Sequence, residues 1–264
     1  MSSELILPEL LMCGYYDSSL FSSAKVTPKR RCTMVEVEHF LEDGKNIFLN
    51  NEAFPIRKNH VFLSLPGDVR NSELPFKTKY IKFMAEGKII KTLSSVPRYF
   101  NMNRSFEILS LLDEIITLHA SKEDNEILLQ GKLLTYISLL IEEAINSQKT
   151  QSYKRAITAQ AQSFIKNNCS RQIKLSDIAR EVNLSPNYFH TIFTEVCRIT
   201  PREYLTECRV SMVKNLLITT NLPLSEIAER SGFNTQQYMT SIFKSEENFS
   251  PAQFRKQHQN EYLK

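Results

Sequence analysis

The sequence of 264 residues predicts an α+β chain of two domains, a β-rich N-terminal domain with a helix pair and an all-α C-terminal domain. Three observations support this prediction. Short β-prone segments separated by turn residues fill about residues 1–100. Amphipathic helical patterns follow over 104–120 and 124–146. Beyond them a helical unit occurs twice between Leu175 and Arg255.

The β-prone segments are short and closely spaced, which is typical of a small sandwich or barrel. The expected strands are Thr33–Phe40, Ile47–Leu49, Ala53–Ile56, Val61–Leu65 and Tyr80–Met84. Turn residues separate them at Asp43-Gly44, Asn50-Asn51 and Pro66-Gly67-Asp68. We therefore expect hairpins in this region, one of them around Gly44.

Each helix of the expected pair carries an apolar stripe on one face. The stripes include Leu109, Leu112 and Ile116 on the first helix, and Ile137 and Leu140 on the second. Two such helices would cap a neighbouring sheet, or would pair with a second copy of the chain. Since a helix has two sides to bury, both interpretations stay open.

A polar segment, Asn146–Tyr153, follows the helix pair and holds no large aliphatic residue. Few contacts should cross such a segment, so we place the linker between the domains at 148–155. The N-terminal domain is then 1–147. The C-terminal domain is 156–264, and it begins with a helix over Ala156–Asn168.

The repeated unit of the C-terminal domain reads as a helix, a tight turn and a second helix. Leu175–Ala179 (LSDIA) returns 49 residues later as Leu224–Ala228 (LSEIA). Four further positions return 50 residues later, namely Tyr188, Ile192, Phe193 and Pro201 as Tyr238, Ile242, Phe243 and Pro251. A helix-turn-helix that places its second helix in a DNA major groove has this build. Two helical hairpins of an ordinary bundle are the alternative, which the duplication disfavours.

Capping and turn residues mark the ends of these helices. Asn183 and Gly232 stand at the two turns, because Asn tolerates positive φ and Gly has no Cβ to oppose it. Pro186 suits the first position of a helix. The expected N-caps are Ser176, Ser185, Ser225 and Asn234.

A joining helix is expected to start at Pro201 and to run to about Thr219. At 1.5 Å per residue its length is roughly 27 Å. One turn of DNA is about 34 Å. A rigid helix of that length could hold two recognition helices in neighbouring major grooves.

Polar side chains on the two second helices turn away from their apolar faces and are the expected DNA contacts. Gln pairs bidentately with adenine, Thr meets a thymine methyl, and Lys suits a phosphate. Ordinary solvated surface is the alternative for each. The candidates are Ser185, Asn187, His190 and Thr191 in the first copy, and Asn234, Thr235, Gln236, Gln237, Thr240, Ser241 and Lys244 in the second.

At these residues the chain resembles the AraC/XylS family of bacterial transcription regulators. The resemblance covers about residues 153–258 and is closest in the second copy, at Ile227-Ala228, Gly232-Phe233, Tyr238, Phe243-Lys244, Ser250-Pro251 and Phe254-Arg255. It implies two helix-turn-helix motifs that read successive major-groove segments of double-stranded DNA. It further implies a cytoplasmic bacterial activator that forms a homodimer through its helix pair, with RNA polymerase as a candidate partner.

Three positions depart from the family pattern. Thr191 and Ser241 stand where members of the family often carry arginine, so bidentate guanine contacts are lost and a more A·T-leaning or shape-dependent site is expected. Asn248 stands where the family often has glycine, and the turn can still form because Asn tolerates positive φ.

The N-terminal region resembles, more loosely, the cupin-like β-barrel that many members of this family use as a sensor. The resemblance rests on the hairpin around Gly44, on Val61–Leu65 followed by Pro66-Gly67, and on Tyr80–Phe83. It implies a small-molecule effector, with sugars as the ligand class that the family suggests. The candidate effector contacts are Arg30, Arg31, Glu36, Glu38, His39 and Arg70.

Composition bears on cofactors and partners. Only His39 and His60 lie in the expected barrel, and Arg70 stands where metal-binding cupins often place a histidine, so we expect no metal and no cofactor. The five cysteines are scattered without a CxxC pair, which fits a reducing cytoplasm. Neither a signal peptide nor a membrane span is expected. Residues 153–264 carry 15 Lys/Arg against 10 Asp/Glu, a net +5 that suits phosphate contacts.

Two other classes of protein are alternatives to a ligand-responsive regulator. One is an architectural DNA-binding protein without a ligand. The other is an enzyme with a helix-turn-helix tail, such as the alkyl-transfer repair proteins, which use a reactive cysteine and a four-cysteine zinc site. Only Cys13 and Cys32 lie in the first 150 residues, so the enzyme is disfavoured and no catalytic residue is expected.

Overall fold

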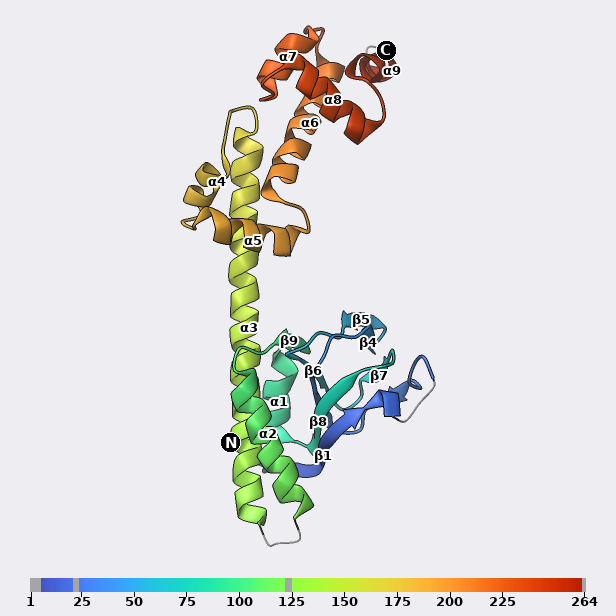
Figure 1. Cartoon of the computed structure of the whole chain (residues 1–264), viewed down its shortest axis with the longest axis vertical. Helices are drawn as coiled ribbons and strands as arrows, with labels where there is room; N and C mark the ends of the chain where they lie inside the picture. The colour runs from blue at the N-terminus through green and yellow to red at the C-terminus, as the bar shows by residue number, and fades with distance from the viewer. Residues whose placement is uncertain (1–5, 21–23, 122–124, 263–264) are drawn as a thin grey trace. The chain divides into compact units, whose positions relative to one another are not determined.

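The computed structural model describes residues 6–20, 24–121 and 125–262, which fall into two compact units (Figure 1). The units meet between Thr150 and Gln151. In their described parts, the N-terminal unit holds nine strands and most of the helix pair, and the C-terminal unit is helical. Among the described residues, no helix has both the length and the apolar character that a membrane span requires.

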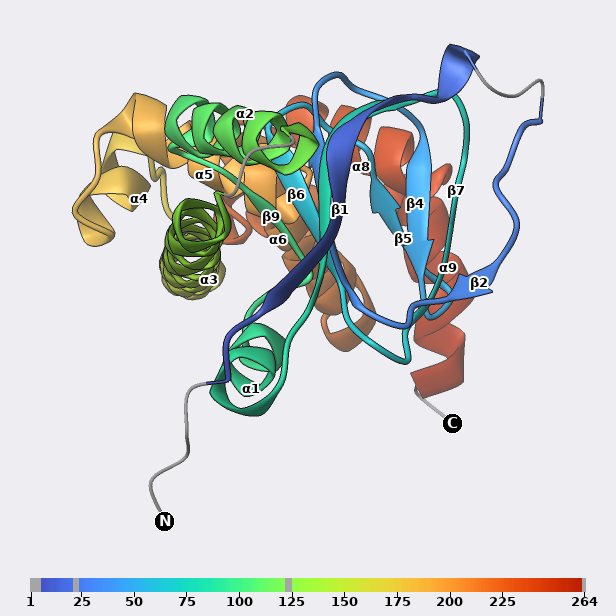
Figure 2. The same cartoon turned by 90° about the horizontal axis from the view of Figure 1, so that it is seen from below.

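The strands of the N-terminal unit form two antiparallel sheets. The five-stranded sheet has, in order, β1 (Glu9–Asp17), β8 (Lys77–Met84), β3 (Val35–Phe40), β6 (His60–Ser64) and β9 (Tyr99–Asn101). The four-stranded sheet has β2 (Arg30–Arg31), β7 (Val69–Ser72), β4 (Asn46–Leu49) and β5 (Glu52–Pro55). A 3-10 turn, η1 (Ser18–Leu20), follows β1. Figure 2 shows the two sheets side by side, with the helix pair beside the larger one.

The expected β-rich region is confirmed, but the closed barrel is not, because the two sheets do not join into one ladder in the described structure. Closure needs long edge strands that pair at a fixed stagger. The edge strands β2 and β9 are only two and three residues long. A two-layer arrangement with a space between the sheets results.

The hairpin expected around Gly44 is wrong. β3 pairs with β6 and β8, whereas β4 pairs with β5 and β7, so the turn at Gly44 carries the chain from one sheet to the other. The hairpin between β4 and β5 does form at Asn50-Asn51, with φ of 50° and 71°. These values suit a two-residue turn that needs positive φ at both positions.

Helices cover the outer face of the five-stranded sheet. They are α1 (Gly87–Ser95), α2 (Ser105–Ala120) and the first part of α3 (Glu126–Asn168). α1 lies inside the region expected to be strands only. Its buried residues Ile89 and Leu93 are four positions apart, which is too short an apolar pattern to separate a helix from a strand.

The helix pair packs onto its own sheet, which corrects the expectation for the dimer interface. Leu112 and Leu140 are fully buried and Ile137 is almost so, in one core with residues of β3, β6 and β8. Leu109 and Ile116 are partly buried against the same core. The apolar stripes therefore cap the sheet, and Leu112, Ile137 and Leu140 are not available to a second chain.

α3 is a single helix of 43 residues, where the sequence suggested one helix ending at 146 and another beginning at Ala156. The segment 146–153 contains no proline or glycine to stop a helix. Its polarity indicates exposure to water rather than an end of the helix. Asp124, the first residue expected in the second helix, lies outside the described residues.

The C-terminal unit contains both expected helix-turn-helix copies. The first copy comprises α4 (Leu175–Glu181) and α5 (Pro186–Cys197), and the second comprises α7 (Leu224–Arg230) and α8 (Gln236–Glu247). The joining helix α6 spans Pro201–Thr219 as predicted, and α9 (Pro251–Tyr262) follows the second copy. Each copy packs its own core, and α6 contributes to both.

Capping follows the prediction at Ser185 and departs from it elsewhere. The Ser185 hydroxyl accepts from the Tyr188 backbone N–H, with Pro186 as the first helical residue. Ser176 and Ser225 lie inside α4 and α7, one position beyond the start of each helix. At α8 the cap is Thr235 rather than Asn234, and its hydroxyl accepts from the Tyr238 N–H at 3.1 Å.

The turns have the expected backbone conformation. Asn183 and Gly232 have φ of 55° and 80°, and Asn248 has 62°. Asn183 and Asn248 therefore adopt the left-handed conformation for which their side chains are suited.

Candidate nucleic-acid interface and candidate ligand pocket

The second helix of each copy, α5 or α8, presents a polar face because its apolar residues fill the core below it. Phe189, Ile192 and Phe193 of α5 are at most 1% exposed. Asn187 and Thr191 lie on the opposite side of the helix and are exposed. Ser185 and His190 are exposed beside them, so all four candidates of the first copy are on the surface.

α8 repeats this arrangement with Met239 and Phe243 buried. Gln237, Ser241 and Lys244 follow one another at the spacing of one helix face, away from the core. Asn234, Thr235 and Gln236 are exposed at the start of the helix, and Thr240 is partly buried. Gln237 and Ser241 stand 50 residues after Asn187 and Thr191, so the two helices present corresponding positions.

Some of the candidate hydroxyls already make hydrogen bonds within the helices. The Ser185 and Thr235 oxygens accept from the backbone as N-caps. The Thr191 hydroxyl donates to the Asn187 carbonyl at 3.1 Å. The hydroxyls of Ser185, Thr191 and Thr235 are therefore already engaged within the helices.

Tyr188 and Tyr238 were not among the expected contacts but are half exposed in the first turn of each recognition helix. Tyr238 is the repeat of Tyr188 and one of the positions that carry the family resemblance. Its ring packs edge-on against Phe233 at 5.9 Å, so one side of the ring is covered and the other meets water. Their duplication at a 50-residue interval was the signal that could have identified them.

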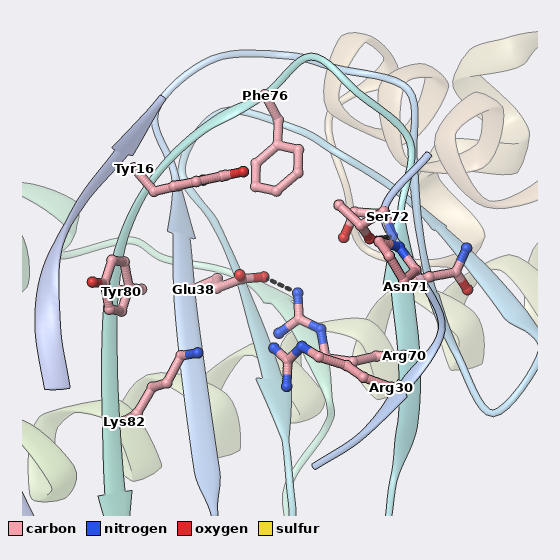
Figure 3. A pocket seen from close by; sticks show the side chains of 11 residues that line it. Tyr16, Arg30, Glu38, Arg70, Asn71, Ser72, Phe76, Tyr80 and Lys82 are labelled. Atoms are coloured by element: carbon pink, nitrogen blue, oxygen red, sulfur yellow. Dashed lines mark hydrogen bonds and ion pairs between the residues drawn. The ribbon is translucent and has the colours of Figure 1, made fainter. Parts of the chain in front are cut away.

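In the N-terminal unit a cavity of about 360 Å³ lies between the two sheets, and its lining is shown in Figure 3. The lining combines aromatic rings with charged and amide groups, a mixture suited to small polar ligands. It includes Tyr16, Arg30, Glu38, Arg70, Asn71, Ser72, Phe76, Tyr80 and Lys82. This cavity is called the inter-sheet pocket below.

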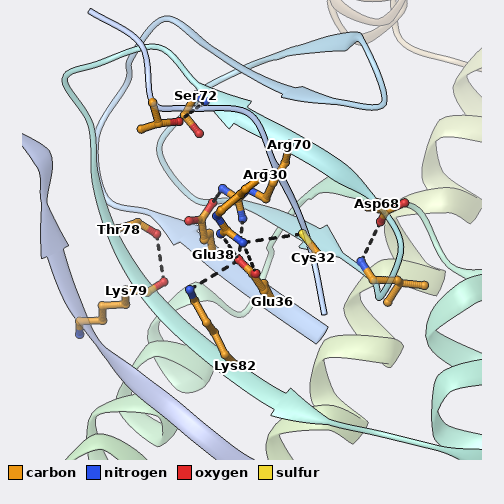
Figure 4. Close-up of polar contacts among 12 residues, drawn as sticks. Arg30, Cys32, Glu36, Glu38, Asp68, Arg70, Ser72, Thr78, Lys79 and Lys82 are labelled. Atoms are coloured by element: carbon orange, nitrogen blue, oxygen red, sulfur yellow. Dashed lines mark hydrogen bonds and ion pairs between the residues drawn. The ribbon is translucent and has the colours of Figure 1, made fainter. Parts of the chain in front are cut away.

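Ion pairs organise the floor of the inter-sheet pocket (Figure 4). The buried Arg70 guanidinium donates to Glu38 at 2.5 Å and to Glu36 at 3.3 Å. Arg30 donates from two nitrogens to the two carboxylate oxygens of Glu36, each at 2.5 Å. The ammonium of Lys82 lies 3.7 Å from Glu36. Three cations thus face two carboxylates, in geometry held by bidentate hydrogen bonds.

The protonation of these groups follows from their partners. Burial acts to raise the pKa of Glu36, but hydrogen bonding from Arg30 and the charges of Arg70 and Lys82 outweigh it, so the pKa is lowered overall. The hydrogen bonds to Glu36 raise the pKa of Arg30. Glu36 and Arg30 therefore stay charged near neutral pH.

The structure brings together four of the six expected effector contacts. Arg30, Glu38 and Arg70 line the inter-sheet pocket, and Glu36 pairs with both arginines. Arg31 is exposed and donates to the Gly67 carbonyl at 3.1 Å, outside the pocket lining.

His39 was expected at the pocket and lies on the opposite face of β3. Successive residues of a strand alternate between its faces, so His39 faces the helices while Glu38 faces the pocket. Its Nε2 lies 2.5 Å from the Tyr136 hydroxyl of α3, and both side chains are fully buried. Burial lowers the pKa of His39 to about 3, so the imidazole is neutral at neutral pH. The pair connects β3 to α3.

Sequence reasoning missed Tyr16, Phe76, Tyr80 and Lys82 of the pocket lining. Tyr80 and Lys82 lie on an expected strand and alternate with the buried Ile81 and Phe83, which was an available signal. Nothing in the sequence indicated Tyr16, because β1 has no clear alternation. Among the described residues, no three His, Cys, Asp or Glu side chains gather closely enough to hold a metal ion.

Comparison with known proteins decides the family. A protein-family model described as a helix-turn-helix domain matches residues 178–257. This range includes the joining helix, the whole second copy and most of the first. The Msm operon regulatory protein of Streptococcus mutans is 27% identical over 237 residues, covering 85% of each chain. The chain belongs to the AraC/XylS family of transcription regulators.

Two other relatives in this family are similar over much of their length. The melibiose operon regulatory protein of Escherichia coli is 28% identical over 200 residues, which are 75% of this chain and 63% of that protein. The raffinose operon transcriptional regulatory protein of Pediococcus pentosaceus is 24% identical over 238 residues, covering 83% of this chain and 84% of the relative. The similarity therefore extends beyond the helix-turn-helix region into the N-terminal unit.

Proposed function

We propose that this AraC/XylS-family chain is a sequence-specific regulator whose α5 and α8 read two neighbouring major-groove segments of double-stranded DNA. The observation that carries the proposal is the pair of exposed polar faces on α5 and α8, set on two cores that share α6. A recognition helix contacts base edges with its N-terminal half. Asn187 and Gln237 occupy that part of each helix. Activation through RNA polymerase in a bacterial cytoplasm stays a prediction.

The chemistry of the two faces favours adenine and thymine. Gln237 and Asn187 carry amides that can pair bidentately with adenine. Thr191 and Ser241 offer no guanidinium for guanine at their positions. Lys244, exposed on the same face as Gln237, is placed to meet a phosphate.

Replacing the Gln237 amide tests this reading. A bidentate base contact contributes about 1–3 kcal/mol of discrimination. Gln237→Ala should therefore raise the Kd for a genomically selected site by about 5- to 150-fold, and should reduce the preference for A·T at one position. Fluorescence anisotropy on the selected site and its single-base variants measures both effects.

Lys244→Ala is the matched control. Lys244→Ala should weaken binding to all DNA sequences alike. It should also lower by about one the slope of log affinity against log salt concentration. If Gln237→Ala also weakens every variant of the site equally, Gln237 does not read a base.

We infer that the inter-sheet pocket binds the effector and that the effector is a sugar. The Arg30–Glu36 and Arg70–Glu38 pairs present fixed donors and acceptors for neighbouring hydroxyls, and the rings of Tyr16 and Phe76 offer apolar cover. Two relatives are named for the operons of the sugars melibiose and raffinose, which supports this ligand class.

A saccharide panel in a thermal-shift assay tests the pocket. A ligand at 100 times its Kd should stabilise the protein by about 2.7 kcal/mol and raise its Tm accordingly. Tyr16→Ala removes a pocket ring and should abolish the shift. Tyr15→Ala is the control, since Tyr15 is exposed and lies outside the pocket lining.

The saccharide panel also separates a sugar-responsive regulator from a DNA-binding protein that takes no sugar. A shift that survives in Tyr16→Ala places the ligand elsewhere. No shift with any saccharide would favour a DNA-binding protein that takes no sugar.

We propose further that two chains associate through the outer side of the helix pair. A groove there is lined by Leu111, Ile127, Leu128 and Gly131, and Ile127 is 90% exposed. Glycine inside a helix costs about 1 kcal/mol relative to alanine. A Cβ at Gly131 would meet no atom within 4 Å in the chain itself, so nothing within the chain requires glycine there. Close approach by a second copy would explain it.

Gly131→Leu should have opposite effects on folding and on association. The helix should gain intrinsic stability. The larger side chain should clash in the dimer and weaken it by about 1–3 kcal/mol, the usual cost of overpacking. Sedimentation equilibrium measures the dimer Kd. Gln148→Leu, exposed on α3 outside the groove lining, is the control and should leave association unchanged. An unchanged dimer Kd in Gly131→Leu would remove this groove as the interface.

A further inference from the structure

Among the described residues, a polar contact joins the flank of the first helix-turn-helix copy to the turn of the second. The turn after α3 flanks the first copy, and the turn at Gly232 belongs to the second. The Gln172 side-chain amide donates to the Gly232 carbonyl at 3.0 Å, across 60 residues of chain. This contact joins the C-terminal end of α3 to the turn that precedes α8.

Arg209, in the middle of α6, completes the contact from the joining helix. Its Nε donates to the Cys169 carbonyl at 2.9 Å, and its Nη2 donates to the Arg171 carbonyl at 2.8 Å. The guanidinium also lies over the ring of Phe233, 6.0 Å from its centre. One side chain therefore meets the first copy's flank and the second copy's turn at the same time.

Gly232 shows how closely the two parts approach. A Cβ at this position would lie 2.3 Å from the Cys169 carbonyl oxygen and 3.0 Å from the Arg209 Nε. The equivalent turn residue of the first copy is Asn183, 49 residues earlier, and its side chain is exposed. Both turns need positive φ, but only the second is pressed against another segment, so the difference between Asn and Gly follows from the contact.

In the part of the chain that the structure describes, the buried hydrophobic residues of the two copies form two separate clusters. A cavity of about 430 Å³ lies between the copies, lined by His190 from α5, Asn234 and Tyr238 from the second copy, and Arg209 itself. The orientation of α8 relative to α5 thus depends on α6 and on the polar contact at its middle.

We propose that Arg209 is a positioning residue that fixes the separation of the two recognition helices, and so determines which spacing of DNA segments the protein accepts. The proposal rests on the proposed reading of two major-groove segments. Each base pair inserted between the segments moves the second by about 3.4 Å and rotates it by about 35°. A rigid pair of helices cannot follow such a change, whereas a loosened pair can.

The experiment measures binding of the full chain to duplexes in which the two segments are moved by one or two base pairs. Wild-type protein should lose at least tenfold in affinity for each change of one base pair. Arg209→Met keeps the length of the side chain and loses both hydrogen bonds. The variant should bind the best spacing more weakly than wild-type protein does. On the altered spacings it should lose less than threefold in affinity relative to its own best spacing.

Two further variants keep the test interpretable. Arg180→Met, exposed on α4 and outside the lining of the cavity between the copies, also removes one cation and should keep the wild-type spacing profile. Gln172→Ala removes the remaining hydrogen bond of the contact, the one to the Gly232 carbonyl. It should reduce the dependence of affinity on spacing less than Arg209→Met does, and it tests the proposal even if Arg209→Met does not fold. A loss of affinity that is equal at all spacings, in both contact variants, would overturn the proposal. If wild-type protein requires only one segment, the two-segment function itself fails, which is a distinct result.

Discussion

The C-terminal unit depends on α6, which contributes to two hydrophobic cores at once. Leu205 packs with Phe189 and Phe193 of the first copy, whereas Val213 and Leu217 pack with residues of the second. A single helix-turn-helix of this size buries too little apolar surface to be stable alone. Each copy therefore completes its core with part of the joining helix. α5 and α8 are thereby held on one shared helix, and the proposed reading of two DNA segments rests on this sharing.

The N-terminal unit depends in a similar way on β3, whose two faces have different partners. Glu36 and Glu38 face the ion pairs of the inter-sheet pocket, and Val35, Val37 and His39 face the helices. A group bound beside Glu38 would thus lie one residue from the contact between His39 and Tyr136 on α3. A ligand acts on such a system only to the extent that it binds one arrangement better than another.

Local patterns in the sequence identified the helices and turns that are specified by residues close to one another in the chain. The duplication predicted the two helix-turn-helix copies, Pro186 and Pro201 predicted the first residues of α5 and α6, and Asn50-Asn51 predicted a real hairpin. Errors arose where distant partners decide the outcome. β3 pairs with β6 and β8 rather than with its neighbour β4, so neither the hairpin at Gly44 nor a closed barrel forms.

His39 was misplaced although alternation along β3 predicts its face. Leu112 and Leu140 are buried because a sheet covers them, which an amphipathic stripe does not specify. Arg209 carried no local signal at all, since its partners lie about 25 to 40 residues away.

Hydroxyl-radical footprinting of the full chain on its genomically selected site, at about 100 mM salt, tests the two-segment reading most directly. Two protected stretches on one face of the DNA are predicted, with centres about 10 base pairs apart. Both should fade together as salt is raised, because one rigid unit holds both helices. A single protected stretch would contradict the reading. So would binding without any footprint that is lost at slightly higher salt, which would mean association by charge alone.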